Sequence, residues 1–376
     1  MTSPILGVLE RARWAPSGDN TQPWRFEIVD DHQCAVYGFD TRADCVYDLD
    51  GHASQMALGG LVETASLAAN AGGFSLVSTR RSTLSDEEVV FDWILEPRRS
   101  AEPDYDSELA AAIETRCANR RPYSPHALES KDVRALQSAM PSKSELRFIR
   151  GWRGKARAAL LCFHNAKLRL TIPEAYEVHR RIIAWDSSHS SDKVPDQALG
   201  VTPLTLRAMR WALADWRRTK FLNKWFAGTW APRIEMDLLP GLACGAHALV
   251  LAEKPPETAN DYVQAGRAMQ RLWLAAARRG LQLQPEMTPL IFSRYARERR
   301  VFSKEPGAAA RALELRDQLS ALVGSDSDAA RVIFFCRVGY GSFPRARSTR
   351  LAVEQLLSSR ETTATAHQAK HSIGAR

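Results

Sequence analysis

The sequence predicts an α+β fold built from two related parts. Segments with the apolar spacing of helices alternate along the chain with short strand-like segments. Each half of the chain also contains a helix, a basic or proline-marked turn, a strand and a long helix rich in small residues. The content of 45% hydrophobic and 25% charged residues is ordinary for a soluble globular protein, and 376 residues can bury a large core. A wholly disordered or fibrous chain is therefore excluded.

The first hundred residues contain four predicted features. They are a helix at 5–14, a strand-like segment at 24–37, a long helix at 53–71 and a strand pair between 74 and 95. Pro16 and Gly18 interrupt the chain after the first helix. Gly59 and Gly60 would weaken the long helix in isolation, so we expect another element to pack closely there. The glycine pair at 72–73 ends this helix.

The rest of the chain continues the alternation of helices and strands. The predicted helices are 107–116, 131–140 and 156–184, the last interrupted at Pro173, and the predicted strands are 147–149, 242–252 and 332–338. Thr258 and Asp261 form a capping box that begins a helix ending at Arg279, with Gly280 following it. The segment 358–376 is polar and uncapped, which predicts a disordered tail.

Charge and cysteine usage limit the classes of partner and compartment. The formal net charge of +8 leaves nucleic acid, an anionic membrane surface and an acidic cofactor open. Six dispersed cysteines without a C-x-x-C pair give no support for a zinc site and favour a reducing compartment. The segment 1–9 has no secretory signal, and no run of about 18 apolar residues occurs, so we expect a cytoplasmic protein. The nine histidines show no metal spacing, and we predict surface or packing roles for them and no metal site.

Residues 186–240 differ in composition from the rest of the chain. The segment begins with serines and then becomes basic and tryptophan-rich, with Trp211, Trp216, Trp225 and Trp230 among arginines and lysines. One interpretation, an alternative to a lid over a binding site, is a pair of amphipathic helices packed on the core. Contact of 203–230 with a membrane surface is a less favoured interpretation. Nucleic-acid binding is weaker still, because no RNA- or DNA-binding motif accompanies the segment.

Three short patches carry residues suited to binding a cofactor. The loop 15–26 reads A-P-S-G-D-N-T-Q-P-W-R-F and offers hydroxyl, amide and backbone groups to a flat heterocycle, although the residue types alone favour a plain turn between helix and strand. Arg116 and Arg120 are four residues apart at a predicted helix end, which suits a phosphate or a solvated basic face. In 337–350 a strand ends in glycines that are followed by three arginines.

Together these patches resemble the FMN-dependent nitroreductase superfamily. A-P-S-x-x-N-x-Q-P-W-x-F is similar to the flavin loop of that superfamily, and the segment 116–120 resembles its R-x-S-x-[KR] phosphate motif. The segment 266–285 resembles its late helix and G-L-x-x-x-P turn, and 337–350 its terminal R-x-G-Y segment. The resemblance extends over nearly the whole chain, and the loop is its most specific part.

The order of the motifs is reversed relative to ordinary members of the superfamily. Here the loop at 16–24 comes about a hundred residues before the phosphate motif. In the superfamily homodimer one subunit supplies the phosphate motif and the other supplies the loop. The resemblance therefore implies a fused tandem protein, an intramolecular pseudo-dimer with antiparallel central sheets flanked by helices. It implies an N-terminal lobe at 1–105 and a C-terminal lobe at 106–357 with a lid at 186–240, as a monomer or a homodimer.

The resemblance also implies which residues hold FMN. Arg116, Ala118 and Arg120 would form the phosphate motif, with a third contact from Arg347 or Arg350. The other implied contacts to the cofactor are Ser17, Asn20, Gln284, Pro285, Met287 and Thr288. The N–H groups of Met287 or Thr288 would lie at the flavin N5. Ala118 replaces the serine of the motif, which removes a hydroxyl donor, and the usual acidic-glycine pair beside N5 is replaced by Met287 and Thr288.

The implied function is hydride transfer from NAD(P)H through FMN to an electron-poor small molecule or biosynthetic intermediate. No side-chain nucleophile or general base is required, so no catalytic side chain is assigned. The alternative is a flavin-storage protein with a closed lid and no turnover. A third hypothesis is an enzyme specialised for one biosynthetic intermediate. The substrate and the choice between NADH and NADPH are not predicted.

Overall fold

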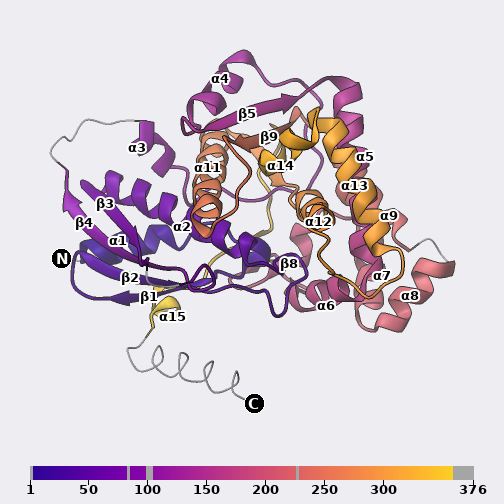
Figure 1. The fold of residues 1–376 in the computed structure, drawn as a ribbon, viewed down its shortest axis with the longest axis horizontal. Coiled ribbons are helices and arrows are strands. Elements are labelled where there is room, and N and C mark those ends of the chain that lie inside the picture. The colour runs from indigo at the N-terminus through magenta and orange to yellow at the C-terminus, as the bar shows by residue number, and fades with distance from the viewer. Residues whose placement is uncertain (1–2, 83–84, 99–104, 226–227, 359–376) are drawn as a thin grey trace.

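The computed structural model describes residues 3–82, 85–98, 105–225 and 228–358, and it has an α+β architecture. Two four-stranded antiparallel sheets lie in different parts of the molecule, with helices packed around and between them (Figure 1). The first sheet comes from the first hundred residues and the second from residues 144–340. The two sheets therefore draw on separate stretches of the chain.

The first sheet has the strand order β1-β2-β4-β3. Its strands are β1 (Trp24–Ile28), β2 (Gln33–Gly38), β3 (Phe74–Arg80) and β4 (Val90–Pro97). Helices α1 (Pro4–Ala12) and α2 (His52–Ala71) accompany this sheet. Phe26 and Trp93 are fully buried and their rings lie 6.2 Å apart, between the sheet and the helices. The sheet therefore contributes both aromatic and aliphatic side chains to the core, Val36 and Leu95 among the latter.

The second sheet has the strand order β10-β11-β9-β5. Its strands are β5 (Ser144–Ile149), β9 (Ala246–Ala252), β10 (Leu281–Pro285) and β11 (Val332–Tyr340). Nearly every residue of the two inner strands β9 and β11 is buried, which explains their continuous apolar sequences. His247 and Arg337 are paired in register on these strands, so the sheet interior also holds charged side chains.

Two long helices join the two parts at the centre of the molecule. α2 crosses α11 (Ala259–Arg278) so closely that a Cβ at Gly59 would collide with the carbonyl oxygen of Val263. A Cβ at Gly266 would likewise collide with the carbonyl oxygen of Met56. The close packing predicted for Gly59 is thus confirmed. One continuous hydrophobic core includes residues from both sheets and from both helices.

The remaining helices outside the tryptophan-rich segment surround these elements and return the chain to the first sheet. They are α3 (Tyr105–Ala110), α4 (Ser130–Ser138), α5 (Gly151–Thr171), α6 (Pro173–Ile182), α12 (Thr288–Arg297), α13 (Ala308–Val323), α14 (Asp326–Arg331) and α15 (Val353–Leu356). After α15, Leu357 forms an isolated bridge with Phe26 of β1. The C-terminal end of the described chain therefore packs on the N-terminal sheet, beside α15 in Figure 1.

The tryptophan-rich segment 186–240 forms short strands and small helices. These are β7 (His189–Ser190), β8 (Val194–Pro195), η2 (Asp196–Ala198), α7 (Pro203–Leu213), α8 (Trp216–Trp225), α9 (Trp230–Arg233), the π-helical turn η3 (Ile234–Leu238) and α10 (Leu239–Leu242). β8 pairs with β6 (Ile183–Ala184), and β7 pairs with β12 (Arg347–Ser348). The predicted pair of amphipathic helices corresponds to α7 and α8, which lie at the periphery in Figure 1.

Most predicted elements occur in the structure, but the segment 24–37 forms two strands, β10 and α15 were not predicted, and further differences follow. The helix predicted at 107–116 ends at Ala110, and turns follow it. The strand predicted at 242–252 begins at Ala246, because the preceding residues form α10. Helices α12, α13 and α14 were not predicted. The division into lobes and the pseudo-dimer stay predictions, and residues 359–376 of the predicted tail lie outside the described residues.

Candidate functional site

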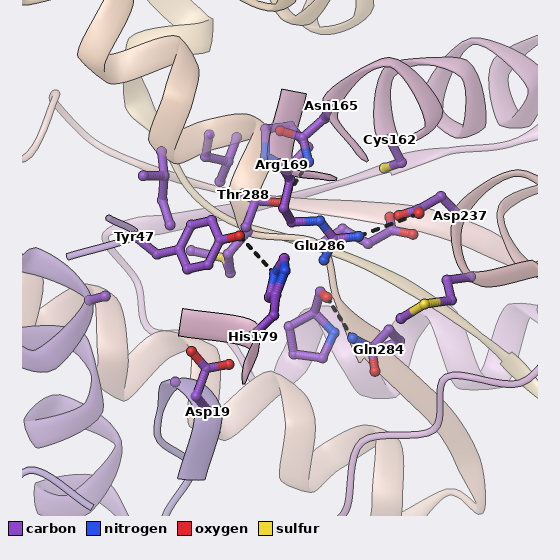
Figure 2. A pocket seen from close by; sticks show the side chains of 18 of the residues that line it. Asp19, Tyr47, Cys162, Asn165, Arg169, His179, Asp237, Gln284, Glu286 and Thr288 are labelled. Atoms are coloured by element: carbon purple, nitrogen blue, oxygen red, sulfur yellow. Dashed lines mark hydrogen bonds and ion pairs between the residues drawn. The ribbon is translucent and has the colours of Figure 1, made fainter. Parts of the chain in front are cut away.

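A large cavity of about 950 Å³ lies where the two parts of the chain meet. Its walls come from the loop at 16–19, the start of α2, helices α5 and α6, the β10–α12 junction, and the segment 194–237. Figure 2 shows polar side chains from these elements around one space, among them Asp19, Arg169 and Gln284. The volume is in the range of protein pockets for drug-sized ligands and cofactors. The cavity is therefore the candidate site of this molecule.

The loop that contributes Asp19 has an unusual backbone conformation. Asp19, Asn20 and Gln22 all have positive φ angles, of 51°, 64° and 48°. Aspartate and asparagine tolerate this region better than other non-glycine residues. The loop surrounds η1 (Gly18–Asn20), and the N–H of Gln22 donates to the Ser17 hydroxyl at 3.0 Å. Such conformations persist only where the surroundings hold them, and they often occur at ligand sites.

The amide side chains of this loop hold the tryptophan-rich segment in place. Asn20 Nδ2 donates to the carbonyl oxygens of Lys193 and Thr349, each at 3.3 Å. Gln22 Nε2 donates to the carbonyl oxygen of Ser191 at 2.8 Å, and Gln22 Oε1 accepts from the N–H of Leu351 at 2.9 Å. The motif N-x-Q thus fastens two distant segments to the loop.

Seven of the eleven residues predicted to contact a cofactor line the cavity. They are Ser17, Ala118, Arg120, Gln284, Pro285, Met287 and Thr288. The other four, Asn20, Arg116, Arg347 and Arg350, are not among the lining residues. Ala118 forms an isolated bridge with Leu283, which brings the 116–120 segment beside β10. Assignment of these residues to a cofactor stays a prediction.

The predicted arrangement of Arg116 and Arg120 on one helix face is wrong. Residues 116–120 follow the helix rather than belong to it, because α3 ends at Ala110. Arg120 reaches the cavity, where Nη1 donates to the carbonyl oxygen of Ala198 at 3.4 Å. Burial lowers the pKa of Arg120, and the neighbouring Asp19 carboxylate partly offsets this effect. A guanidinium with so few partners in a buried site suits an anionic ligand.

Arg116 belongs to a separate cluster of arginines beside the cavity. Its Nη2 donates to the carbonyl oxygen of Trp14 at 2.7 Å, and its guanidinium lies over the ring of Trp273, which lines the cavity. Burial, together with the charge of Arg347, lowers the pKa of Arg116 to about 10. Arg350 donates from Nε to the carbonyl oxygen of Ala15 at 2.9 Å. Burial lowers the pKa of Arg350 strongly, with further lowering by Arg116 and Arg347.

A fully buried ion cluster supports the β10–α12 side of the cavity. Glu286 Oε2 lies 2.8 Å from His247 Nδ1, and Glu286 Oε1 accepts from Arg337 Nη1 at 3.0 Å. His247 Nε2 lies 2.9 Å from the carbonyl oxygen of Gly241, so both ring nitrogens face acceptors. Burial opposes the charged imidazole, but Glu286 outweighs this effect and raises the pKa of His247 to about 10. His247 is therefore protonated, and the three side chains together carry one positive charge.

The opposite wall of the cavity carries a second polar group. The Tyr47 hydroxyl lies 2.9 Å from His179 Nε2, as the dashed line in Figure 2 shows. Burial and the charge of Arg169 lower the pKa of His179 to about 3, so its ring is neutral. Arg169 Nη2 is 3.5 Å from Asp237, and burial raises the pKa of Asp237 to about 6. This wall therefore offers both a neutral hydrogen-bonding pair and a loosely paired guanidinium.

The β10–α12 junction has hydrogen-bonding groups suited to a heterocyclic ring. The Oε1 of Gln284 is buried, lines the cavity and lacks a hydrogen-bond partner. Met287 and Thr288 stand at the start of α12, where helix geometry leaves N–H groups without intrahelical acceptors. Trp273 and Met269 add an apolar wall. An orphaned acceptor, free N–H groups and an aromatic wall together fit a flat cofactor with an anionic tail near Arg120.

Several cavity residues were not singled out from the sequence. Glu286 directly follows β10 and lines the cavity, whereas His247 on β9 is not among the lining residues. Only the register of the sheet brings both against Arg337, which begins the 337–350 patch. Tyr47, Arg169, His179 and Asp237 come from segments with no motif of their own. The available signal was the helical spacing of basic residues in α5 and α6. This spacing does not tell whether the basic side chains face a cavity or the solvent.

Metal clusters and membrane-spanning helices are absent from the described residues. No group of three or more histidine, cysteine or acidic side chains there has the geometry to hold a metal ion. No helix in the described ranges is both long and apolar enough to cross a bilayer. All six cysteines are free thiols, and five of them are buried.

Comparison with known proteins yields similarity to solved structures. No protein-family profile and no curated protein match the sequence. Among solved structures, the chain is similar to the FMN-dependent nitroreductase NfnB from Mycobacterium smegmatis, determined in complex with NADPH. The TM-score is 0.35 and the identity is 15%, over 68% of this chain and 99% of NfnB. These values are too low to assign a family or a function.

Proposed function

We propose that the protein is an FMN-dependent oxidoreductase that uses NAD(P)H to reduce an electron-poor small molecule. One observation carries this proposal. Three segments more than a hundred residues apart, around Ser17, Arg120 and Gln284, line a single cavity. Each was singled out from the sequence by its resemblance to the flavin-binding segments of the nitroreductase superfamily. Their convergence supports a shared ligand.

Different residues of the cavity would bind different parts of FMN. Arg120 would bind the phosphate, with the positive field of the Arg116 cluster behind it. Ser17, Gln284 and the N–H groups at the start of α12 would bond the polar edge of the ring. Trp273 and the loop of residue 16 would exclude water from its faces. Bound FMN would supply the redox chemistry, accepting hydride from NAD(P)H and delivering it to the substrate.

The charges near the ring favour a reduced, anionic cofactor. The cluster of Glu286, His247 and Arg337 carries one net positive charge at the β10–α12 junction. Arg169 adds a second positive charge that Asp237 only loosely pairs. Fixed positive charge in a site of low water content stabilises developing negative charge. The protein would therefore promote the reduction of its cofactor without a catalytic side chain.

An absorbance spectrum with an FMN titration tests the proposal. We expect flavin absorbance in the purified protein, or quenching of FMN fluorescence on its addition. Arg120→Gln should raise the Kd for FMN at least tenfold, as expected when a buried charge-assisted contact is lost. Arg121→Gln is the matched control, because this neighbouring side chain is exposed. A colourless protein that does not alter FMN fluorescence would overturn the proposal.

Flavin storage is the second candidate, favoured by the way the tryptophan-rich segment closes the site. The Asn20 and Gln22 amides fasten residues 190–193 across the loop, and α7 and α8 line the cavity. A site closed in this way would hold FMN without turnover. NAD(P)H oxidation with a nitroaromatic or quinone acceptor separates the two candidates, since steady turnover rejects storage.

A further inference from the structure

The α7–α8 pair, residues 203–225, has two unlike faces. On the inner face Thr205, Met209, Thr219 and Leu222 line the cavity. On the outer face Trp225 is 67% exposed and Trp211 43%, and Leu204, at the rim of the cavity, is 78% exposed. No residue of α8 is buried. The apolar side chains of the outer face therefore have no counterpart within the described chain that removes them from water.

The same outer face is strongly basic. Residues 203–225 contain one acidic residue, Asp215, and six basic ones: Arg207, Arg210, Arg217, Arg218, Lys220 and Lys224. Within the described ranges, the ion pair formed by these six is that of Arg210 with Asp186 at 2.8 Å. Three of the others stand over tryptophan rings within the pair, Lys224 over Trp225 among them. Among the residues that the structure describes, the five bases other than Arg210 form no ion pair with a carboxylate.

We propose that the outer face of the α7–α8 pair docks on the surface of an anionic lipid bilayer. Lysines and arginines attract the anionic headgroups, and tryptophan rings settle at the level of the headgroups. The exposed Leu204 at the rim of the cavity favours lipid over nucleic acid, because an aliphatic side chain gains little from a nucleobase but can enter the acyl boundary. The contact lies along the surface, since the inner face of both helices is already used by the cavity.

This placement has a consequence for the cavity. The two helices that would meet the bilayer also form one wall of the cavity, through Met209 and Leu222. Docking would therefore bring the cavity next to the membrane. The inference does not depend on the flavin, because it rests on the outer face of the pair alone.

Co-sedimentation of the full chain with vesicles tests this proposal. We expect binding to vesicles of phosphatidylcholine with phosphatidylglycerol, weak binding to phosphatidylcholine alone, and loss of binding at high salt. The double variant Lys220→Gln/Lys224→Gln should lower the partition coefficient about 25-fold, since each base near an anionic surface contributes a factor of about five. Trp225→Ser should lower it as well.

Trp152→Ser is the matched control for the tryptophan variant. Trp152 is 74% exposed in the first turn of α5, next to other basic residues but outside the α7–α8 pair. Trp152→Ser should leave vesicle binding unchanged. All substituted side chains are exposed, and circular dichroism verifies that each variant folds. Equal binding by wild type and the lysine variant would overturn the proposal, as would binding to single-stranded DNA without binding to vesicles. A dimer that forms through Trp225 would also overturn it.

Discussion

Two pairs of helices in this molecule differ in whether other parts of the protein cover their surfaces. Where α2 crosses α11, glycines allow backbone to meet backbone, and the buried Glu63 is bonded at 2.8 Å to both Arg267 and Arg271. In the α7–α8 pair the outer face is apolar and basic, and within the described chain carboxylates do not balance it. The first pair is fully determined by contacts inside the protein. The second has surface properties that a contact outside the protein would explain.

Gly266→Ala should break the central crossing and produce the largest effect. The added methyl group would meet the backbone of Met56, which cannot move without displacing α2. We expect a loss of about 3 kcal/mol or more in the free energy of unfolding, measured with urea. Gly7→Ala in α1 is the control, because nothing lies near its Cβ position. That variant should gain about 0.5–1 kcal/mol, and equal losses in both would contradict the comparison.

Glu63→Gln should have an intermediate effect on the same crossing. The amide cannot serve the two guanidinium groups as the carboxylate does, but Arg271 keeps its 2.7 Å contact with Asp106. We expect a loss of about 1–3 kcal/mol, below that of a fully buried pair because both arginines are partly exposed. Glu10→Gln, at a surface pair with Arg13 in which the carboxylate is 44% exposed, should change stability by less than about 0.5 kcal/mol.

Trp225→Ser should have the smallest effect on folding. Its ring is largely exposed, so we expect a change within about 0.5 kcal/mol in the same urea measurement. Trp216→Ser on the inner side of α8 sharpens the contrast, because the Trp216 ring lies 5.1 Å from that of Tyr176. That variant should lose about 1–2 kcal/mol. A large loss of stability in Trp225→Ser would mean that the outer face of the α7–α8 pair contributes to folding.

Local signals in the sequence predicted the elements better than their contacts. The capping box of Thr258 and Asp261 marks the start of α11, and Gly280 follows its end with a φ of +70°. Gly59 predicts a close approach, but its counterpart Gly266 is 207 positions away and no local pattern identifies it. Pairings of this kind are set by the tertiary fold, which local spacing does not encode.

The candidate site illustrates the same limit. Seven of the predicted residues line the cavity because they belong to loops with recognisable motifs. The segment of Arg116 and Arg120 was expected on a helix, yet tertiary contacts such as the Ala118–Leu283 bridge hold it in an extended form. His247 and Glu286 depend on strand register, which the alternation of apolar residues does not specify when both faces are buried.

The central crossing also affects how the chain is made. When the ribosome has released the first hundred residues, the first sheet is complete, but the face of α2 that bears Glu63 has no cover. Its partners Arg267 and Arg271 lie 204 and 208 residues later. At 5–20 residues per second this delay is roughly 10–40 s. The nascent N-terminal part therefore exposes the surface on which its final packing depends, and chaperones have that interval in which to protect it.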